Sequence, residues 1–495
     1  MSELTPQNKN ETDSLQALLD RIHQNPDFPT FSRMVQEINL LASDSDQRSA
    51  NDLANIILRD FSLTQKILKL VNSAQFRHFG GTIHTVSRAV VILGFEEIRQ
   101  IALTLMLFDH FKPDRGQQRL QQSMLQALFS ALLAQTIAPR LGVRKEEEVF
   151  LSALFMDLGR IVLLRHAPEK MDEIEALCTS EKISEESASQ RCIGATLPRL
   201  GLVLAQGWNL PDPVLHSMQP PIGPKNITRL DANSRGSAIA RLSHTIASNL
   251  STLPPAEANR LMLEEARQLG IDGNLLFESV EKAKEKIRVY TRILPPVVQN
   301  LPLLKQLSGL DNAPAAQETP AEPAVPTPAS HAELIIQCIE DITQALLGEF
   351  DLNPILMTVL ETLYRGLSAT QAMLFIMDRQ GKQLKARFGF GEAPPDVLRS
   401  LTVDMSVDNP FARALLRQQD YLLSLDDPAL QPHQNWQFQD GKSDQAAFYP
   451  IIVNGRPLGL FYLEGPHRIF TPTALNAIKM LRNQTILAIR QKHGG

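Results

Sequence analysis

Apolar residues before residue 310 recur at helical spacing. An α-helix repeats every 3.6 residues, so apolar positions three and four apart share one face. Gly94 directly follows one such stripe, where a glycine in the left-handed conformation commonly ends a helix. Strand-like alternation is nearly absent, which predicts an all-helical region. The stripes are Phe31–Leu41, Leu53–Ile57, Leu63–Val71, Val86–Leu93, Ile98–Phe108, 123–140, 147–165 and 235–250.

A stretch rich in proline and alanine, DNAPAAQETPAEPAVPTPAS, occupies residues 311–330. It has no apolar periodicity, and a segment of this composition cannot bury a core. We therefore predict a semi-extended linker that separates two parts of the chain. The predicted organisation is a flexible N-terminal segment over 1–22, a helical domain over 23–310, the linker, and a second domain over 331–495.

The pattern after residue 331 changes to two helices followed by short strand-like runs. Asn454-Gly455 separates two of these runs, and Asn-Gly favours the positive φ angles of a two-residue hairpin turn. A turn is also expected over Asp378–Gly381. We predict an α+β domain with one antiparallel sheet and flanking helices. The expected elements are helices 333–348, 352–367 and 472–491, with strands Ala372–Asp378, Leu384–Phe390, Tyr421–Leu425, Ala447–Val453 and Leu458–Glu464.

Composition narrows the classes of function. The formal net charge of -5 at pH 7 argues against nucleic acid as a main partner. Cys178, Cys192 and Cys338 form no CxxC pair and are odd in number, which disfavours a disulfide framework and favours a reducing cytoplasm. No apolar run approaches the ~20 residues that a membrane helix needs, and the polar N-terminus is unlike a signal peptide.

The segment Asp27–Phe108 resembles the HDOD family, through pieces that occur in the family's order. The resemblance implies an all-α module. The amide of Asn72 is predicted to cap or bridge helix ends; the alternative is that it only terminates a helix, and both roles are structural. The matching pieces are the turn Phe28–Phe31, the helix Leu53–Ile57, the helix end at Asn72, Ser73 and Ala74, and the helix end at Leu93 and Gly94.

HDOD domains resemble HD-type metal phosphohydrolases, which hold a divalent metal with His, an adjacent His-Asp pair and a later Asp. In this sequence the His-Asp position matches Met156-Asp157, the earlier His falls near Phe129, and the late Asp falls near His244. Methionine cannot replace imidazole as a ligand for a hard divalent metal. No metal is therefore predicted. Asp157 is interpreted as a carboxylate that caps a helix or packs beside Gly159, with a lone metal ligand as the alternative.

The family's Trp-x-Leu-Pro turn resembles Trp208–Pro211. Trp208 is predicted to anchor the core, and Pro211 is predicted to end a helix. A single His216 follows where metal-binding relatives carry paired histidines. His166, near the end of an apolar helix, is interpreted as a surface cap.

Residues 333–492 resemble a GAF domain. The evidence is the leading helix, a first strand, an expected turn over Phe388–Gly391, a helix over Pro410–Leu415 and the hairpin PIIVNGRPLGLFYLEG. GAF domains often bind a small molecule, but this sequence lacks the Asn-Lys dipeptide of cyclic-nucleotide binders. Bilin-binding GAF domains need a cysteine in the pocket, and Cys338 lies in the first helix, outside the sheet. Haem would need an axial histidine, and His433 in a polar loop is a poor candidate. No cofactor is predicted, and the GAF ligand is left open.

Together these features predict a cytoplasmic bacterial signal-transduction protein without catalytic activity. Its HDOD module would act as a regulatory and protein-interaction unit coupled to a sensory GAF domain. The alternatives are a metal-dependent HD-type phosphohydrolase or cyclic-dinucleotide phosphodiesterase, and a ligand-free scaffold. The expected partners are other signalling proteins and a small molecule, with neither nucleic acid nor membrane. A homodimer through the GAF terminal helices is also predicted, because both helices carry apolar residues around most of their circumference. The alternative is that the HDOD half or the linker covers these residues within one chain.

Overall fold

The protein is described by a computed structural model that covers residues 6–25, 28–41, 47–73, 82–111, 117–219, 226–227, 230–294, 301–309, 331–346, 350–391, 400–425 and 443–493. Its chain forms two compact units. The helical unit comprises Met1–Ala42, Ser73–Gln75 and Arg99–Thr319, and the mixed unit comprises Ser43–Asn72, Phe76–Ile98 and Pro320–Gly495. The predicted linker over 311–330 lies outside the described residues.

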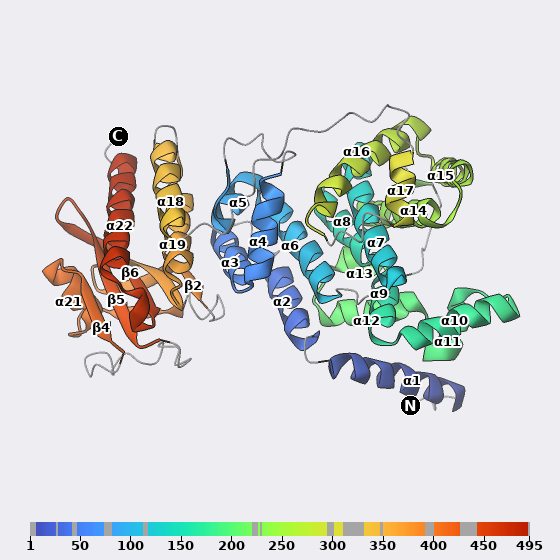
Figure 1. Ribbon diagram of the computed structural model, residues 1–495, viewed down its shortest axis with the longest axis horizontal. Helices are drawn as coiled ribbons and strands as arrows, with labels where there is room; N and C mark the ends of the chain where they lie inside the picture. Colours follow the sequence, from blue (N-terminus) through green and yellow to red (C-terminus); the bar gives the residue numbers. More distant parts are fainter. Residues whose placement is uncertain are drawn as a thin grey trace. The chain divides into compact units, whose positions relative to one another are not determined.

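The helical unit is built around α7, which packs against α8, α9, α14 and α16 (Figure 1). Most residues of α7 are buried, because neighbouring helices surround it. Helix α6 begins in the mixed unit and enters the helical unit after Ile98. The helices are α1 Pro6–His23, α2 Phe28–Leu40, α6 Phe95–His110, α7 Gln118–Ile137, α8 Glu146–Phe155, α9 Leu158–His166, α10 Pro168–Glu181, α11 Glu185–Ile193, α12 Leu197–Gly207, α13 Asp212–Ser217, α14 Ala232–Thr252, α15 Pro255–Leu269, α16 Gly273–Thr291 and α17 Pro302–Gly309.

The prediction of an all-helical region is confirmed, with two differences in detail. The N-terminal segment expected to be flexible forms α1, whose Leu18, Leu19 and Ile22 are buried. The single stripe over 147–165 is divided into α8 and α9 by a break at Met156 and Asp157. Among the described helices, none has the length and apolar character that crossing a membrane requires.

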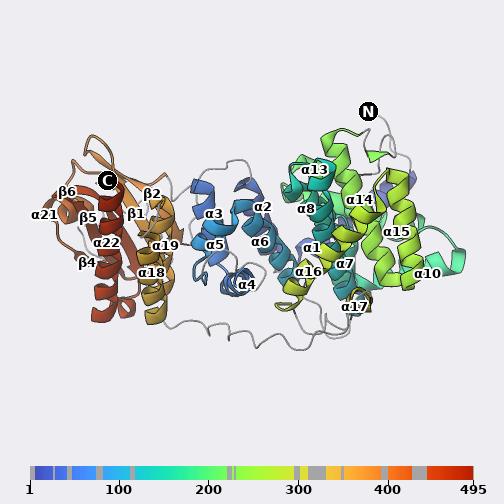
Figure 2. The same ribbon diagram turned by 90° about the horizontal axis from the view of Figure 1, so that it is seen from above.

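The mixed unit contains a six-stranded antiparallel sheet in the order β3-β2-β1-β6-β5-β4. Helices α19 and α22 pack on one face, with α18 lying against both, and α21 packs on β5 and β6 (Figures 1 and 2). The elements are α18 His331–Leu346, α19 Leu352–Leu367, β1 Gln371–Met377, β2 Gln383–Gly391, β3 Thr402–Asp404, α21 Pro410–Arg417, β4 Tyr421–Ser424, β5 Gln445–Val453, β6 Arg456–Gly465 and α22 Pro472–His493.

The predicted α+β domain is confirmed. Asn454 and Gly455 have φ angles of 51° and 77° and join β5 to β6, as the Asn-Gly pair predicted. The turn predicted over Phe388–Gly391 is wrong, because these residues continue β2 and pair with β1. The short edge strand β3 was not predicted.

Three helices that precede the expected domain boundary belong to the mixed unit. They are α3 Gln47–Leu58, α4 Phe61–Val71 and α5 Val86–Leu93, here called the α3–α5 segment. Helix α3 contacts β2, and α5 contacts α19. The compact units therefore divide the chain differently from the boundaries predicted at 310 and 331.

Candidate functional site

The junction between α8 and α9 contains Met156 and Asp157. Asp157 occupies the N-cap position of α9, but its carboxylate makes no capping hydrogen bond. Instead its Oδ1 lies 3.4 Å from Nε of Arg160, whose Nη2 lies 2.5 Å from Oε1 of Glu185. The interpretation of Asp157 as a helix cap is therefore wrong. Its partner is a cation one turn further along the same helix.

Arg160 supplies permanent positive charge beside Asp157. Burial would lower the pKa of Arg160, but Asp157 and Glu185 together raise it above its ordinary value. The guanidinium therefore offsets the negative charge of the Asp157 carboxylate. Sequence analysis did not single out Arg160, although its spacing from Asp157 on one helix could have suggested the pair.

Of the other two positions matched to metal ligands, one has a side chain without a ligand atom, Phe129, and the other has an imidazole, His244. Phe129 is fully buried in α7, and His244 is half-buried in α14. Nδ1 of His244 is buried without a hydrogen-bond partner in the described structure. Within the described ranges, no group of three or more His, Cys, Asp or Glu side chains is arranged to hold a metal ion.

Gly159 lies at a close crossing of α9 and α12. A Cβ atom at this position would overlap the carbonyl oxygen of Leu197 and lie 2.9 Å from the amide nitrogen of Gly201. Gly201 is also restricted, although less severely, since its Cβ would lie 2.9 Å from the amide nitrogen of Gly159. The two glycines therefore permit backbone-to-backbone contact next to the Met156-Asp157 junction.

Trp208 is buried in an aromatic cluster with Phe28 and Phe31. His110 stacks on Phe31 with ring centroids 4.1 Å apart, and its own centroid lies 6.3 Å from that of His166. Interpretation of His166 as a surface cap is therefore wrong, because its Nε2 is buried without a partner in the described structure. Burial lowers the pKa of His110 to about 3 and that of His166 to about 4.

Pro211 does not end a helix, contrary to the prediction. Helix α12 ends at Gly207, and Pro211 stands directly before α13. The turn between them is made by Trp208 and Asn209, the latter with a φ angle of 51°. His216 is exposed near the end of α13.

The side chain of Asn72 links the end of α4 to the segment that precedes α5 through hydrogen bonds. Its Nδ2 donates to the carbonyl oxygens of Leu68 at 2.9 Å and Ile83 at 2.7 Å, and its Oδ1 accepts the amide of Ile83 at 2.7 Å. The side chain thus fixes where α5 begins relative to α4. Ser73 is buried beside it, while Ala74 lies outside the described residues.

Gly94 connects two helices and has a φ angle of 95° and a ψ angle of 155°. The positive φ agrees with the sequence, but the ψ angle is not that of the predicted left-handed cap. Its amide donates to the carbonyl of Val90, and α6 begins at the next residue. Leu93, the last residue of α5, is half-buried.

The space between the sheet and α21 is filled by aromatic side chains of the domain. Phe411 of α21 lies 5.4 Å from Phe375, 4.9 Å from Phe448 and 5.4 Å from Tyr462, measured between ring centroids. The Tyr462 hydroxyl donates to Glu464, and burial raises its pKa above the ordinary value. Cys338 is buried in α18, where burial raises its pKa to about 12, and His433 lies outside the described residues.

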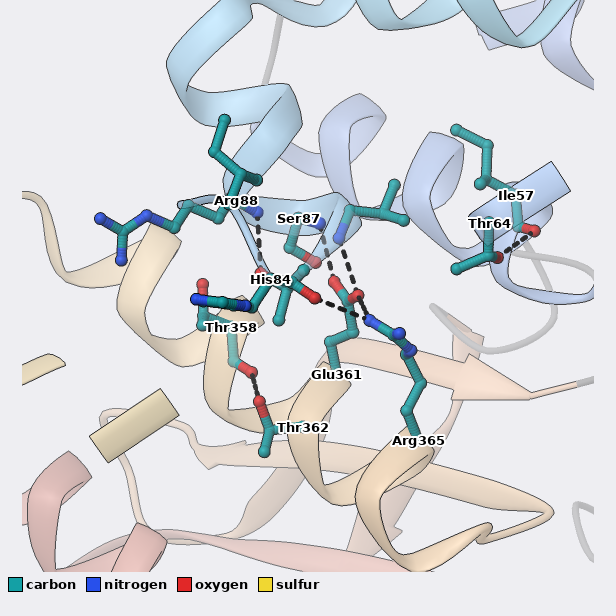
Figure 3. A network of polar contacts seen from close by, with 12 residues as sticks. Ile57, Thr64, His84, Ser87, Arg88, Thr358, Glu361, Thr362 and Arg365 are labelled. Carbon is teal, nitrogen blue, oxygen red and sulfur yellow. Dashed lines mark hydrogen bonds and ion pairs between the residues drawn. The ribbon is translucent and has the colours of Figure 1, made fainter. Parts of the chain in front are cut away.

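A buried polar network joins the N-terminus of α5 to α19 (Figure 3). Glu361 of α19 is fully buried and accepts the amide of Val86 at 2.8 Å with Oε1 and that of Ser87 at 2.7 Å with Oε2. Arg365 donates to Glu361 Oε1 at 3.1 Å and to the carbonyl of His84 at 3.0 Å. We call the Glu361 carboxylate with the two α5 amides the carboxylate cap.

Two further contacts surround the carboxylate cap. Arg88 of α5 pairs with Asp341 of α18 at 2.5 Å. In α3, Asn51 Nδ2 donates to the carbonyl of Gly389 at 3.3 Å, and Asn55 Oδ1 accepts the amide of Gly391 at 3.0 Å. Polar contacts from α3 and α5 therefore reach three elements of the α+β domain.

Comparison with known families assigns both parts of the chain. A family profile described as the HDOD domain matches residues 28–220, and one described as the GAF domain matches residues 351–489. These domains together are an architecture of the signal-transduction type. The chain is thus an HDOD domain protein with a C-terminal GAF domain.

Individual relatives are distant. An uncharacterized protein from Treponema pallidum (strain Nichols) is 23% identical over 205 residues, which are 41% of this chain and 38% of that protein's length. A structure from Shewanella amazonensis SB2B, provisionally named a phosphohydrolase, is 20% identical and has a TM-score of 0.42. The matched region covers 59% of this chain and 98% of the Shewanella chain. The GAF domain of an Acinetobacter phosphoenolpyruvate-protein phosphotransferase is 11% identical and has a TM-score of 0.27. The matched region covers 32% of this chain and 96% of the Acinetobacter domain.

Proposed function

We propose that this chain is a non-catalytic signal-transduction protein. Its HDOD domain acts as a regulatory and protein-binding unit, and its GAF domain acts as the sensory unit. The observation that carries the proposal is the pairing of Asp157 with Arg160 beside Met156. A position that holds metal in HD enzymes is here an ion pair next to a thioether.

The junction of Met156 and Asp157 opposes metal binding in two ways. Before Asp157 could bind a cation, its carboxylate would have to leave a partly buried guanidinium that would then lack one of its partners, and separating such a pair is unfavourable. Met156 supplies a soft sulfur, which suits neither Mg²⁺ nor Mn²⁺. A metal-activated water needs several ligands held together, and this junction offers one carboxylate that is already neutralised.

Assays of the full chain with Mg²⁺, Mn²⁺ or Fe²⁺ are expected to show no hydrolysis of cyclic di-GMP or of an activated phosphodiester above the buffer rate. The reason is the loss of ligand chemistry at Met156 and Phe129. Metal-dependent turnover that Asp157→Asn abolishes would establish the phosphohydrolase alternative instead. Asp212→Asn, an exposed position on α13, is the matched control and should behave as the parent.

The ligand-free scaffold is the second candidate, favoured by the aromatic side chains between the sheet and α21. It differs from a sensor in one measurable respect. A sensory GAF domain should show a ligand-dependent rise in melting temperature when the full chain is screened against small molecules. If no small molecule in the screen shifts the melting temperature, the scaffold is favoured.

Self-association through the GAF terminal helices remains part of the proposal, together with binding to other signalling proteins. Ile336 of α18 and Met480 and Leu487 of α22 are exposed apolar side chains. Exposed apolar groups of this kind commonly mark an interface. Light scattering of the full chain should give a dimer mass that Met480→Glu with Leu487→Glu reduces to a monomer; a monomeric parent would contradict this part.

A further inference from the structure

We propose that the GAF surface formed by α18, α19 and the end of β2 is the docking surface for the α3–α5 segment of the HDOD domain, and that Glu361 controls the attachment. This inference rests on the proposed function, because it names how the sensory domain would act on the regulatory one. The occupant is a segment of the same chain, identified by the contacts that it makes.

The carboxylate cap supplies hydrogen-bond acceptors that the backbone of α5 cannot supply for its own first amides. The first amides of a helix lack carbonyl partners within the helix and need an acceptor from elsewhere. In α5 the amide of Arg88 is satisfied locally by Thr85 Oγ1 at 3.2 Å, but those of Val86 and Ser87 are satisfied by Glu361. A GAF side chain therefore completes the N-terminus of an HDOD helix, and its negative charge is favourable at that end of the helix dipole.

The carboxylate cap depends on the position of α19, because that helix carries both the buried carboxylate of Glu361 and the cation beside it. Glu361 is fully buried, so an ionised carboxylate requires both its hydrogen bonds and a nearby cation. Arg365, one turn later on α19, provides the cation and also binds the carbonyl of His84 just before α5 (Figure 3). A shift of α19 would separate the carboxylate from both amides at once.

The edge of the sheet provides a second attachment point. In an extended strand, residues two apart direct their backbone groups to the same side. The carbonyl of Gly389 and the amide of Gly391 are such a pair, and the i and i+4 side chains Asn51 and Asn55 contact them. Helix α3 thus continues the hydrogen bonding of β2 with side-chain amides, as a neighbouring strand would do with its backbone.

The backbone connects the carboxylate cap directly to the helical unit, so a change at the cap can be transmitted along it. Helix α5 ends at Leu93, Gly94 connects it to α6, and α6 continues into the helical unit after Ile98. A ligand or partner that moved α19 would release the N-terminus of α5 and remove its influence on α6. The GAF domain would regulate the HDOD domain through this segment.

The test is residue-level amide hydrogen exchange on the full chain with two variants that approach the cap from opposite sides. Glu361→Gln changes the acceptor. Val86→Pro removes one donor, because proline has no backbone N–H. The change should be tolerated, because proline is common at the first position of a helix and Thr85 already has the extended backbone (φ -126°, ψ 148°) required before proline. Each variant should accelerate exchange at Ala89 and Val90 by about 10- to 100-fold, as expected for losing a charge-assisted bond.

Amides of β1 and β6 should keep their protection in Val86→Pro, since that change lies outside the GAF domain. Ser87→Ala is the matched control, because it keeps both backbone donors and should leave exchange in α5 unchanged. Unaltered exchange at α5 in both Glu361→Gln and Val86→Pro would overturn the inference. If Glu361→Gln also exposes β1 and β6, Val86→Pro alone decides. Metal-dependent hydrolysis would defeat the proposed function but would not alter this result.

Discussion

Replacing Gly159 by alanine is expected to lower the free energy of unfolding of the helical unit by about 3–5 kcal/mol. The added methyl group would overlap the carbonyl oxygen of Leu197, a backbone atom of α12. Backbone cannot move aside as a flexible side chain can, so α9 and α12 would have to separate. Calorimetry should show the corresponding transition about 10 °C lower.

Gly207→Ala is the matched control for this substitution. Gly207 is the last residue of α12, and a Cβ atom there would meet nothing within 4 Å. Its stability should change by about 0.5 kcal/mol or less. A Gly159→Ala protein as stable as Gly207→Ala would show that the α9–α12 crossing is looser than described.

Acidification from pH 6.5 towards pH 4 is expected to destabilise the helical unit through His110 and His166. Burial, followed by the charges of His166 and Arg165, lowers the pKa of His110 to about 3. Burial, with Arg165 and Arg21, lowers that of His166 to about 4. The unfolded chain therefore binds these protons below pH 6.5, whereas the folded chain does not until pH 4 or lower. Stability is complete above pH 6.5 and falls as the pH decreases through this window.

The contribution of His110 is about 1.4 kcal/mol per pH unit within that window. His110→Phe should remove this part of the slope and preserve the stacking on Phe31, which denaturant unfolding at pH 7, 6 and 5 would reveal. His216→Gln, an exposed position on α13, should retain the parent slope. Equal slopes for His110→Phe and the parent would mean that His110 protonates in the folded protein as readily as in the unfolded chain.

Features of local origin could be predicted from the sequence. The Asn454-Gly455 hairpin depends on two adjacent residues that tolerate positive φ, and the structure has both. Helical stripes likewise follow from one-sided burial of apolar residues. The break between α8 and α9 was missed because VFLSALFMDLGRIVLL stays apolar across it. The apolar pattern indicates that these residues are buried, whereas the break between the helices depends on how the backbone turns at Met156 and Asp157.

Features that depend on contacts far apart in sequence could not be predicted. Glu361 lies 275 residues from Val86, and in the sequence it reads as one charged residue of a mostly apolar helix. The same is true of Asn51 and Asn55, which look like ordinary polar positions of α3. A weak signal existed: α19 is buried around most of its circumference, which one sheet face does not explain. The signal indicates that something covers α19, without naming α5.

The central claim is that the α3–α5 segment is held by the GAF domain rather than by the helical unit, and that it links the GAF domain to the rest of the HDOD domain. Native-state hydrogen exchange in increasing denaturant tests it most directly, with the Gly159→Ala protein used to weaken the helical unit alone. We expect the amides of Ala89 and Val90 to keep their protection, as do those of Leu374 in β1 and Phe461 in β6, while Leu128 in α7 loses protection. If Ala89 and Val90 lose protection together with Leu128, the segment belongs to the helical unit and the claim is contradicted.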